Sequence, residues 1–104
     1  MKRYVATLTQ SGANAPQCFT THHNTLGGDP VFSFFADGQF QVNLAGLVST
    51  GRFIAYLTVP FDANEGWSNQ VHPSGDLLNI LTYINGTLSN DCMSSGQCLV
   101  IEAY

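Results

Sequence analysis

With 104 residues, the chain is long enough for a single hydrophobic core, and we expect residues 1–104 to form one β-domain. Only 10% of the residues are charged, against about 25% in typical soluble proteins, whereas Ser, Thr, Asn and Gln fill 31 of the 104 positions. The net charge of −4 and the lack of a basic stripe argue against nucleic-acid binding. No apolar run approaches the roughly 20 residues that a membrane-spanning helix needs, so we expect no membrane partner.

The chain begins with a predicted strand. Alternate residues of Tyr4–Thr9 are apolar, which places Tyr4 and Leu8 on one face. The preceding Lys2-Arg3 pair resembles the charged start of a signal peptide, but the stretch that follows is too polar and too alternating for an apolar signal core. We therefore expect no export signal.

Turn residues then interrupt the chain at short intervals, which is typical of all-β proteins. A polar strand is expected over Cys18–Thr25. Asp37-Gly38 predicts a hairpin between Val31–Ala36 and Phe40–Leu44, because both turn positions tolerate positive φ. Arg52–Val59 is apolar on both faces, so we expect it in the middle of a sheet.

The C-terminal part contains one ambiguous segment. Asp76–Asn85 fits either a helical face or a strand, and the β-branched and aromatic content of Ile80–Ile84 favours the strand. Thr87–Gln97 is expected to be a loop, and Leu99–Tyr104 a closing strand. Both ends of the chain should therefore lie in the same sheet system.

These segments predict an all-β fold, namely a single-domain β-sandwich or jelly-roll-like barrel of about seven to eight short antiparallel strands. The pattern does not separate a sandwich from a closed barrel. The expected core contains Leu8, Phe32, Phe34, Phe40, Val42, Leu44, Phe53, Leu57, Ile80, Ile84, Leu99 and Ile101.

The longest segment without a strand pattern is Phe61–Gly75, and loops carry function more often than strands do. Trp67 is the only tryptophan of the chain. With Asn64, Asn69 and His72 it could form a glycan-binding patch, in which an aromatic ring stacks on a sugar and amides bond its hydroxyls. The structural alternative is that Trp67 plugs the end of the barrel or an intersubunit seam.

No motif indicates catalysis, a metal or another cofactor. The histidines His22 and His23 are adjacent, so alternation along a strand would point them to opposite faces and prevent them from sharing one metal. The acidic stretch Asp62-x-Asn64-Glu65 only faintly resembles a calcium loop. No serine or cysteine has the sequence context of an activated nucleophile, so we expect no enzyme.

The three cysteines leave two possibilities open. Cys92 and Cys98 flank a turn-like loop and could form a disulfide across a hairpin if their Cα atoms lie within about 7 Å. A pair of free thiols is the alternative. Cys18 is then left over and is expected to be a small buried hydrophobe.

Several turn motifs resemble a family of small, mostly uncharacterised all-β proteins found in bacteriophages and in flavobacteria. The resemblance is carried by Leu8-Thr9-Gln10-Ser11-Gly12, Ala15-Pro16, Asn24-Thr25-Leu26-Gly27-Gly28, Leu44-Ala45-Gly46 and Ile101-Glu102-Ala103-Tyr104. It spans most of the chain and implies a small β-module associated with a virion and made in the host cytoplasm. It implies no catalytic residues.

From this resemblance and the low charge we expect a phage structural protein that decorates a capsid or forms part of a fibre. It would contact other virion proteins and copies of itself, with a trimer as the first expectation. The seam between copies is expected to involve Phe35, Tyr56, Tyr83 and Tyr104.

Overall fold

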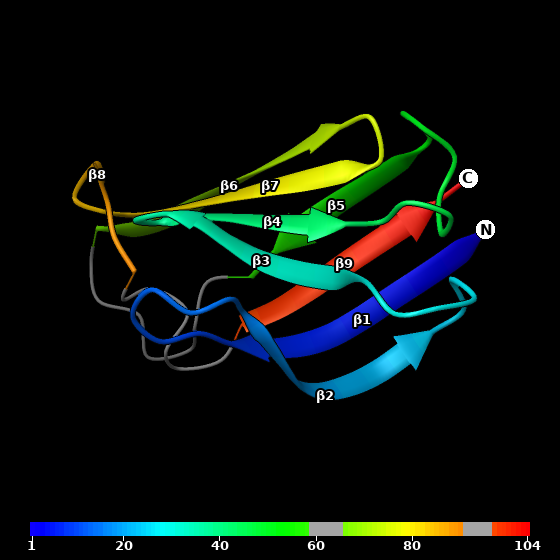
Figure 1. Ribbon diagram of the computed structural model, residues 1–104, viewed down its shortest axis with the longest axis horizontal. Coiled ribbons are helices and arrows are strands. Elements are labelled where there is room, and N and C mark those ends of the chain that lie inside the picture. Colours follow the sequence, from blue (N-terminus) through cyan, green and yellow to red (C-terminus); the bar gives the residue numbers. More distant parts are fainter. Residues whose placement is uncertain (59–65, 91–96) are drawn as a thin grey trace.

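The computed structural model describes residues 1–58, 66–90 and 97–104, and within them the chain folds as two antiparallel β-sheets. The first sheet has the strand order β2-β1-β9-β5, and the second has the order β3-β4-β7-β6, with the short β8 added beside β7. The sheets form two layers (Figure 1). Their strands are β1 Lys2–Thr9, β2 Gln17–Asn24, β3 Val31–Ala36, β4 Gln39–Asn43, β5 Phe53–Leu57, β6 Trp67–Ser74, β7 Leu77–Ile84, β8 Thr87–Leu88 and β9 Gln97–Ala103. The predicted all-β fold is confirmed, as a β-sandwich.

The core lies between the sheets and follows from the alternation within strands. In β1 the side chains of Tyr4, Ala6 and Leu8 are buried while the residues between them are half-buried, and in β7 the buried face carries Leu78 and Ile80. The buried residues of this core, from both sheets and from the loops that follow β2 and β4, are Tyr4, Ala6, Leu8, Leu26, Phe40, Val42, Leu44, Phe53, Leu57, Leu78, Ile80, Leu99, Ile101 and Ala103.

Three residues of the expected core are less buried than predicted. Phe32 and Phe34 are half-buried and pack against the core from β3, because β3 is the edge strand of its sheet and the neighbouring layer does not fully cover it. Ile84, near the end of β7, is also half-buried and lies outside the core cluster. The other expected core residues are buried as predicted.

Two local predictions are confirmed. The hairpin β3–β4 turns at Asp37-Gly38, with Phe34 opposite Phe40 in register. The ambiguous segment 76–85 is a strand, because β7 pairs with β4 on one side and with β6 along its whole length on the other. Both neighbours require the period of two that buries alternate residues.

Part of the expected loop Phe61–Gly75 is instead a strand, so that prediction is wrong. β6 runs antiparallel to β7 from Trp67 opposite Ile84 to Ser74 opposite Leu77. Its alternation is hard to see in the sequence because the inward face carries a polar residue, Asn69, between Trp67 and Val71. Pro73 is tolerated because β6 lies at the edge of its sheet, where one side of the strand needs no ladder donors.

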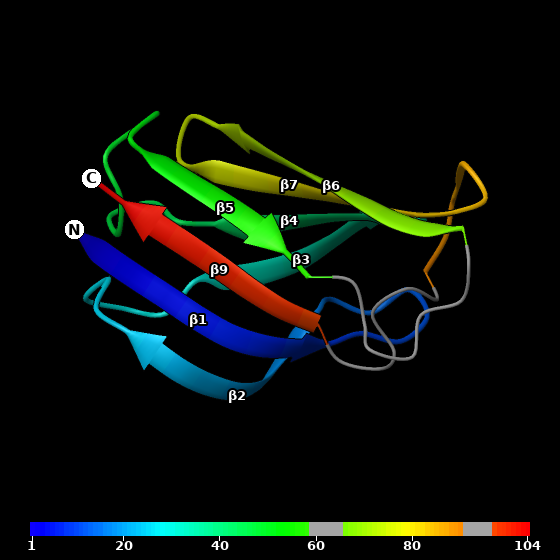
Figure 2. The same cartoon turned by 180° about the vertical axis from the view of Figure 1, so that it is seen from behind.

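The strand β5 is also placed differently from the prediction, since it lies at the edge of the first sheet and pairs only with β9 within it. Its free side runs alongside β6 of the second sheet, where the side-chain amide of Asn69 donates to the carbonyl oxygen of Leu57 at 3.1 Å. The layers therefore meet along β5 and β6. On the opposite side of the sandwich the edges are β2 and β3 (Figure 2).

Both ends of the chain belong to the first sheet, as predicted. β1 and β9 are antiparallel neighbours, and Lys2 lies opposite Ala103, so the N and C ends lie side by side in both views. In the described part of the chain, no helix is long and apolar enough to cross a membrane.

Candidate functional site

The outer face of the second sheet carries a shallow groove of about 410 Å³, to which all four main strands contribute. Strand alternation turns Phe40 and Ile80 into the core, so the residues beside them face outward. We call this surface the outer-face groove. The side chains that line it are Phe35, Gln39, Gln41, His72, Asn79 and Leu81.

Register determines how these side chains lie relative to one another. Gln41 on β4 is opposite Asn79 on β7, and Asn79 is opposite His72 on β6, so the three form one row across the sheet. In the next row, Leu81 lies between Gln39 and Gln70. Residues paired in this way have Cβ atoms about 4.5–5.5 Å apart. The groove therefore has a floor of closely spaced amides.

The polar groups of the groove are mostly available. His72 Nε2 lies 3.1 Å from Gln70 Oε1. Within the described residues, the side chains of Gln39, Gln41 and Asn79 make no hydrogen bond, and each amide offers two donors and an acceptor. None of the lining residues is charged. The groove can thus bond uncharged donors and acceptors, with Phe35, 65% exposed, at its β3 rim.

The three described members of the predicted glycan patch, Trp67, Asn69 and His72, do not share one face. Trp67 and Asn69 face inward on β6 and are half-buried, and the amide of Asn69 bonds the backbone of β5. His72 has the opposite parity and faces outward. The physical reason is that β6 is a strand, whose alternation separates residues that a loop could have gathered. Asn64 lies outside the described residues.

The four residues of the expected oligomer seam do not share one face. Phe35 and Tyr83 belong to the second sheet, whereas Tyr56 lies on β5 of the first sheet and Tyr104 directly follows β9. Phe35, Tyr56 and Tyr104 are exposed and Tyr83 is half-buried. The fold therefore places two of them in one layer, on β3 and β7, and two in the other, on β5 and after β9. Their role in a seam between copies stays a prediction.

The two adjacent histidines lie on the same face, contrary to the alternation argument. β2 has register shifts at which His22 and Phe19 have no partner on β1, so the strand is bulged twice. His23 is paired with Val5 on the outer face, and His22 Nε2 lies 2.8 Å from the hydroxyl of Thr7 on that face. In the described part of the chain, however, no three His, Cys, Asp or Glu side chains group closely enough to hold a metal ion.

The cysteines differ partly from expectation. Cys18 is exposed on β2 rather than buried, because β2 is an edge strand beyond the cover of the second sheet. The sulfur of Cys18 lies 3.1 Å from the hydroxyl oxygen of Thr21. The pKa of the Tyr4 hydroxyl is raised, chiefly because Tyr4 is buried and also because it forms a hydrogen bond with Cys18. Cys98 is half-buried and a free thiol. This agrees with the alternative of free thiols and not with a Cys92–Cys98 disulfide. Cys92 itself lies outside the described residues.

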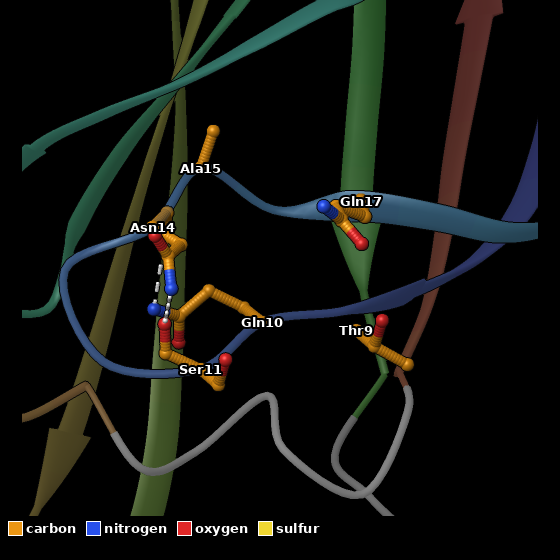
Figure 3. A pocket seen from close by; sticks show the side chains of 6 residues that line it. All are labelled: Thr9, Gln10, Ser11, Asn14, Ala15 and Gln17. Carbon is orange, nitrogen blue, oxygen red and sulfur yellow. Dashed lines mark hydrogen bonds between the residues drawn. The ribbon is translucent and has the colours of Figure 1, made fainter.

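A second cavity, of about 360 Å³, lies at the loop between β1 and β2 (Figure 3). Gln10 is 4% exposed, and its amide nitrogen donates to the carbonyl oxygens of Gly12 and Asn14, while the backbone and side-chain nitrogens of Asn14 both donate to Ser11. These bonds hold the turn together from within. We therefore assign this cavity to the structure of the loop, although Gln10 Oε1 has no hydrogen-bond partner among the described residues.

Comparison with models of protein families, with curated proteins and with solved structures returns no match. The resemblance to small phage and flavobacterial proteins thus stays a prediction.

The sequence reasoning missed most of the outer-face groove. The signal was present as outward-facing amides, Gln39, Gln41, Gln70 and Asn79, in three strands. Recognising it required the strand order β4-β7-β6, which no local pattern discloses.

Proposed function

We propose that the chain is a non-enzymatic structural module of a phage particle, a capsid decoration or fibre component, that assembles with copies of itself and with other virion proteins. The phage context is supported by the resemblance of its turn motifs. The assembly role is supported by one observation of the fold, the edge strand β3.

Among the described residues, β3 pairs with β4 alone, so the backbone groups on its other side have no strand partner. Its sequence, Val-Phe-Ser-Phe-Phe-Ala, contains no charge and no proline, two of the devices that prevent edge pairing. Its one irregularity lies near its end, between Phe34 and Ala36, and leaves Val31–Phe34 in regular register. Val31 and Phe35 are 64% and 65% exposed. An uncharged, apolar edge of this kind favours addition of another strand.

The most suitable partner for β3 is the same strand of a second copy. Two antiparallel β3 strands related by a two-fold axis present the same surface to each other, and neither carries a charge that would repel the other. The trimer expected from the sequence would instead need β3 to pair with a different edge. The available edge, β2, has two bulges that interrupt regular pairing.

Light scattering over a dilution series tests the proposal. The wild-type protein should show twice the monomer mass of 11.2 kDa, and Ser33→Lys should show the monomer mass because it places two ammonium groups near each other at the middle of the paired strands. Thr20→Lys on the bulged edge β2 is the matched control and should remain dimeric.

Other masses contradict the proposal. A wild-type protein that is monomeric at every concentration would exclude self-assembly. A trimer, or a dimer that Ser33→Lys leaves intact, would exclude pairing through β3. Ser33 and Thr20 are both exposed, so we expect each variant to keep the fold. Circular dichroism of each variant checks this.

A further inference from the structure

We propose that the outer-face groove binds a neutral oligosaccharide. This inference concerns the outer face of the second sheet, does not depend on the assembly through β3, and uses a different site from the predicted patch around Trp67.

The polar groups of the groove are side-chain amides and one imidazole. Gln41, Asn79 and His72 lie in one row, and the amides of Gln41 and Asn79 have no other hydrogen-bond partner among the described residues. A side-chain amide can donate to one hydroxyl and accept from another. A row of amides at cross-strand spacing therefore suits neighbouring hydroxyl groups on sugar rings.

The groove also has an apolar part, formed by Leu81 and Phe35. Leu81 lies beside Gln39 in the floor, and the exposed ring of Phe35 lies at the rim. The C–H face of a sugar ring can pack against such a ring, which removes apolar area of Phe35 from water. The volume of about 410 Å³ is within the range of roughly 300–1,000 Å³ seen for ligand sites.

The charge of the lining residues distinguishes neutral sugars from other polar ligands. No lysine or arginine lines the groove. Lys2 and Arg3 belong to β1, and Arg52 directly precedes β5, so all three cations accompany the first sheet. A phosphate, a nucleic acid or an acidic sugar would therefore find no lysine or arginine in the groove to compensate its charge. Neutral hydroxyl groups match the groove, which no lysine, arginine or carboxylate lines.

The test uses an array of neutral and anionic glycans, followed by titration of the best ligand. The wild-type protein should bind neutral glycans. Gln41→Ala combined with Asn79→Ala should weaken the affinity at least tenfold, because two hydrogen bonds are lost. Gln17→Ala, which removes an exposed amide from β2 of the first sheet, is the matched control and should bind like the wild type.

Three outcomes overturn the inference: no binding to any glycan, binding confined to anionic glycans, or neutral binding that the double variant retains in full. The outcome is separable from the assembly proposal, since the mass measured by light scattering does not depend on Gln41 or Asn79. Chemical shifts of the Gln and Asn side-chain amides locate the ligand independently of affinity. Shifts confined to residues away from the groove would also contradict it.

Discussion

Gly38 is the residue at which the hairpin β3–β4 meets the rest of the second sheet. Its φ of +68° lies in the left-handed region, and a Cβ built on it would come within 2.6 Å of Ser89 N and 2.7 Å of Thr82 O. Its N–H donates to Asn90 Oδ1, and its carbonyl accepts from the N–H of Thr82. Position 38 therefore requires glycine, because its backbone is in the left-handed region and because a Cβ would clash with the neighbouring backbone.

We expect Gly38→Ala to lower the free energy of unfolding by about 2–5 kcal/mol. Left-handed strain contributes about 1–2 kcal/mol, and displacement of the neighbouring backbone adds about 1–3 kcal/mol. Urea unfolding followed by circular dichroism measures the change. Gly46→Ala is the control, because Gly46 has φ +78° but no atom within 4 Å of the built Cβ, and it should lose only the strain component. Equal losses in both variants would show that the close contact is unimportant.

For single residues, the sequence predicts the backbone conformation of a turn better than it predicts which distant residues form hydrogen bonds with each other. The Asp37-Gly38 turn is predictable because the dipeptide itself determines the turn. Asn90 accepts a hydrogen bond from the Gly38 N–H and donates one to Asp37, and both bonds join residues more than 50 positions apart in the chain. Nothing near either residue indicates such a contact, because chain folding alone brings them together.

Asn69, which the sequence suggests as a ligand-binding residue, has a structural role in the contact between β5 and β6. We expect Asn69→Ala to lower the free energy of unfolding by about 1–3 kcal/mol, because the carbonyl of Leu57 loses the donor of a partly buried hydrogen bond. Ser68→Ala, at the next, exposed position of β6, should change it by less than about 0.5 kcal/mol. Chemical denaturation of both variants measures the difference. An unchanged stability for Asn69→Ala would refute the proposed role of this bond.

Bulges and edges are the features of individual strands that the sequence does not disclose. Alternation predicts the faces of β1 and β7 correctly because β9 pairs regularly with β1, and β4 and β6 both pair regularly with β7. It fails at His22 and His23, since two bulges in β2 shift the faces of the residues that follow. Edge positions are likewise invisible locally, so the apolar β5 was expected in the middle of a sheet.

The whole molecule depends on one core that both sheets build. Leu99 of the first sheet and Val42 of the second are both completely buried in the same cluster. A sheet of this size with one apolar face does not persist without its cover, so we expect the two sheets to unfold together.

Unfolding in urea should therefore be a single transition, with coincident midpoints for the fluorescence of Trp67 and for circular dichroism. Trp67 reports on the second sheet, whereas circular dichroism reports on both. Leu99→Ala in the first sheet should lower the free energy of unfolding by about 2–5 kcal/mol and move both midpoints equally. Midpoints that separate in the wild type or in this variant would show that each sheet unfolds independently.

The two proposals are compatible in one assembly. Strands paired antiparallel about a two-fold axis continue one sheet, so a pair joined at β3 would carry both outer-face grooves on the same side. Two grooves acting together would then bind a repetitive glycan more tightly than one, provided that the ligand spans them.

By itself, the sequence determined the all-β class, most of the strands, the Asp37-Gly38 turn and most of the core, because each depends on neighbouring residues and a period of two. Tertiary structure alone decided the strand order, the bulges of β2, the edge positions of β3 and β5, and the role of Asn69. It also gathered Gln41, Asn79 and His72 into one groove. The physical reason is that pairing between distant segments is selected by burial of the whole core, and no single segment encodes it.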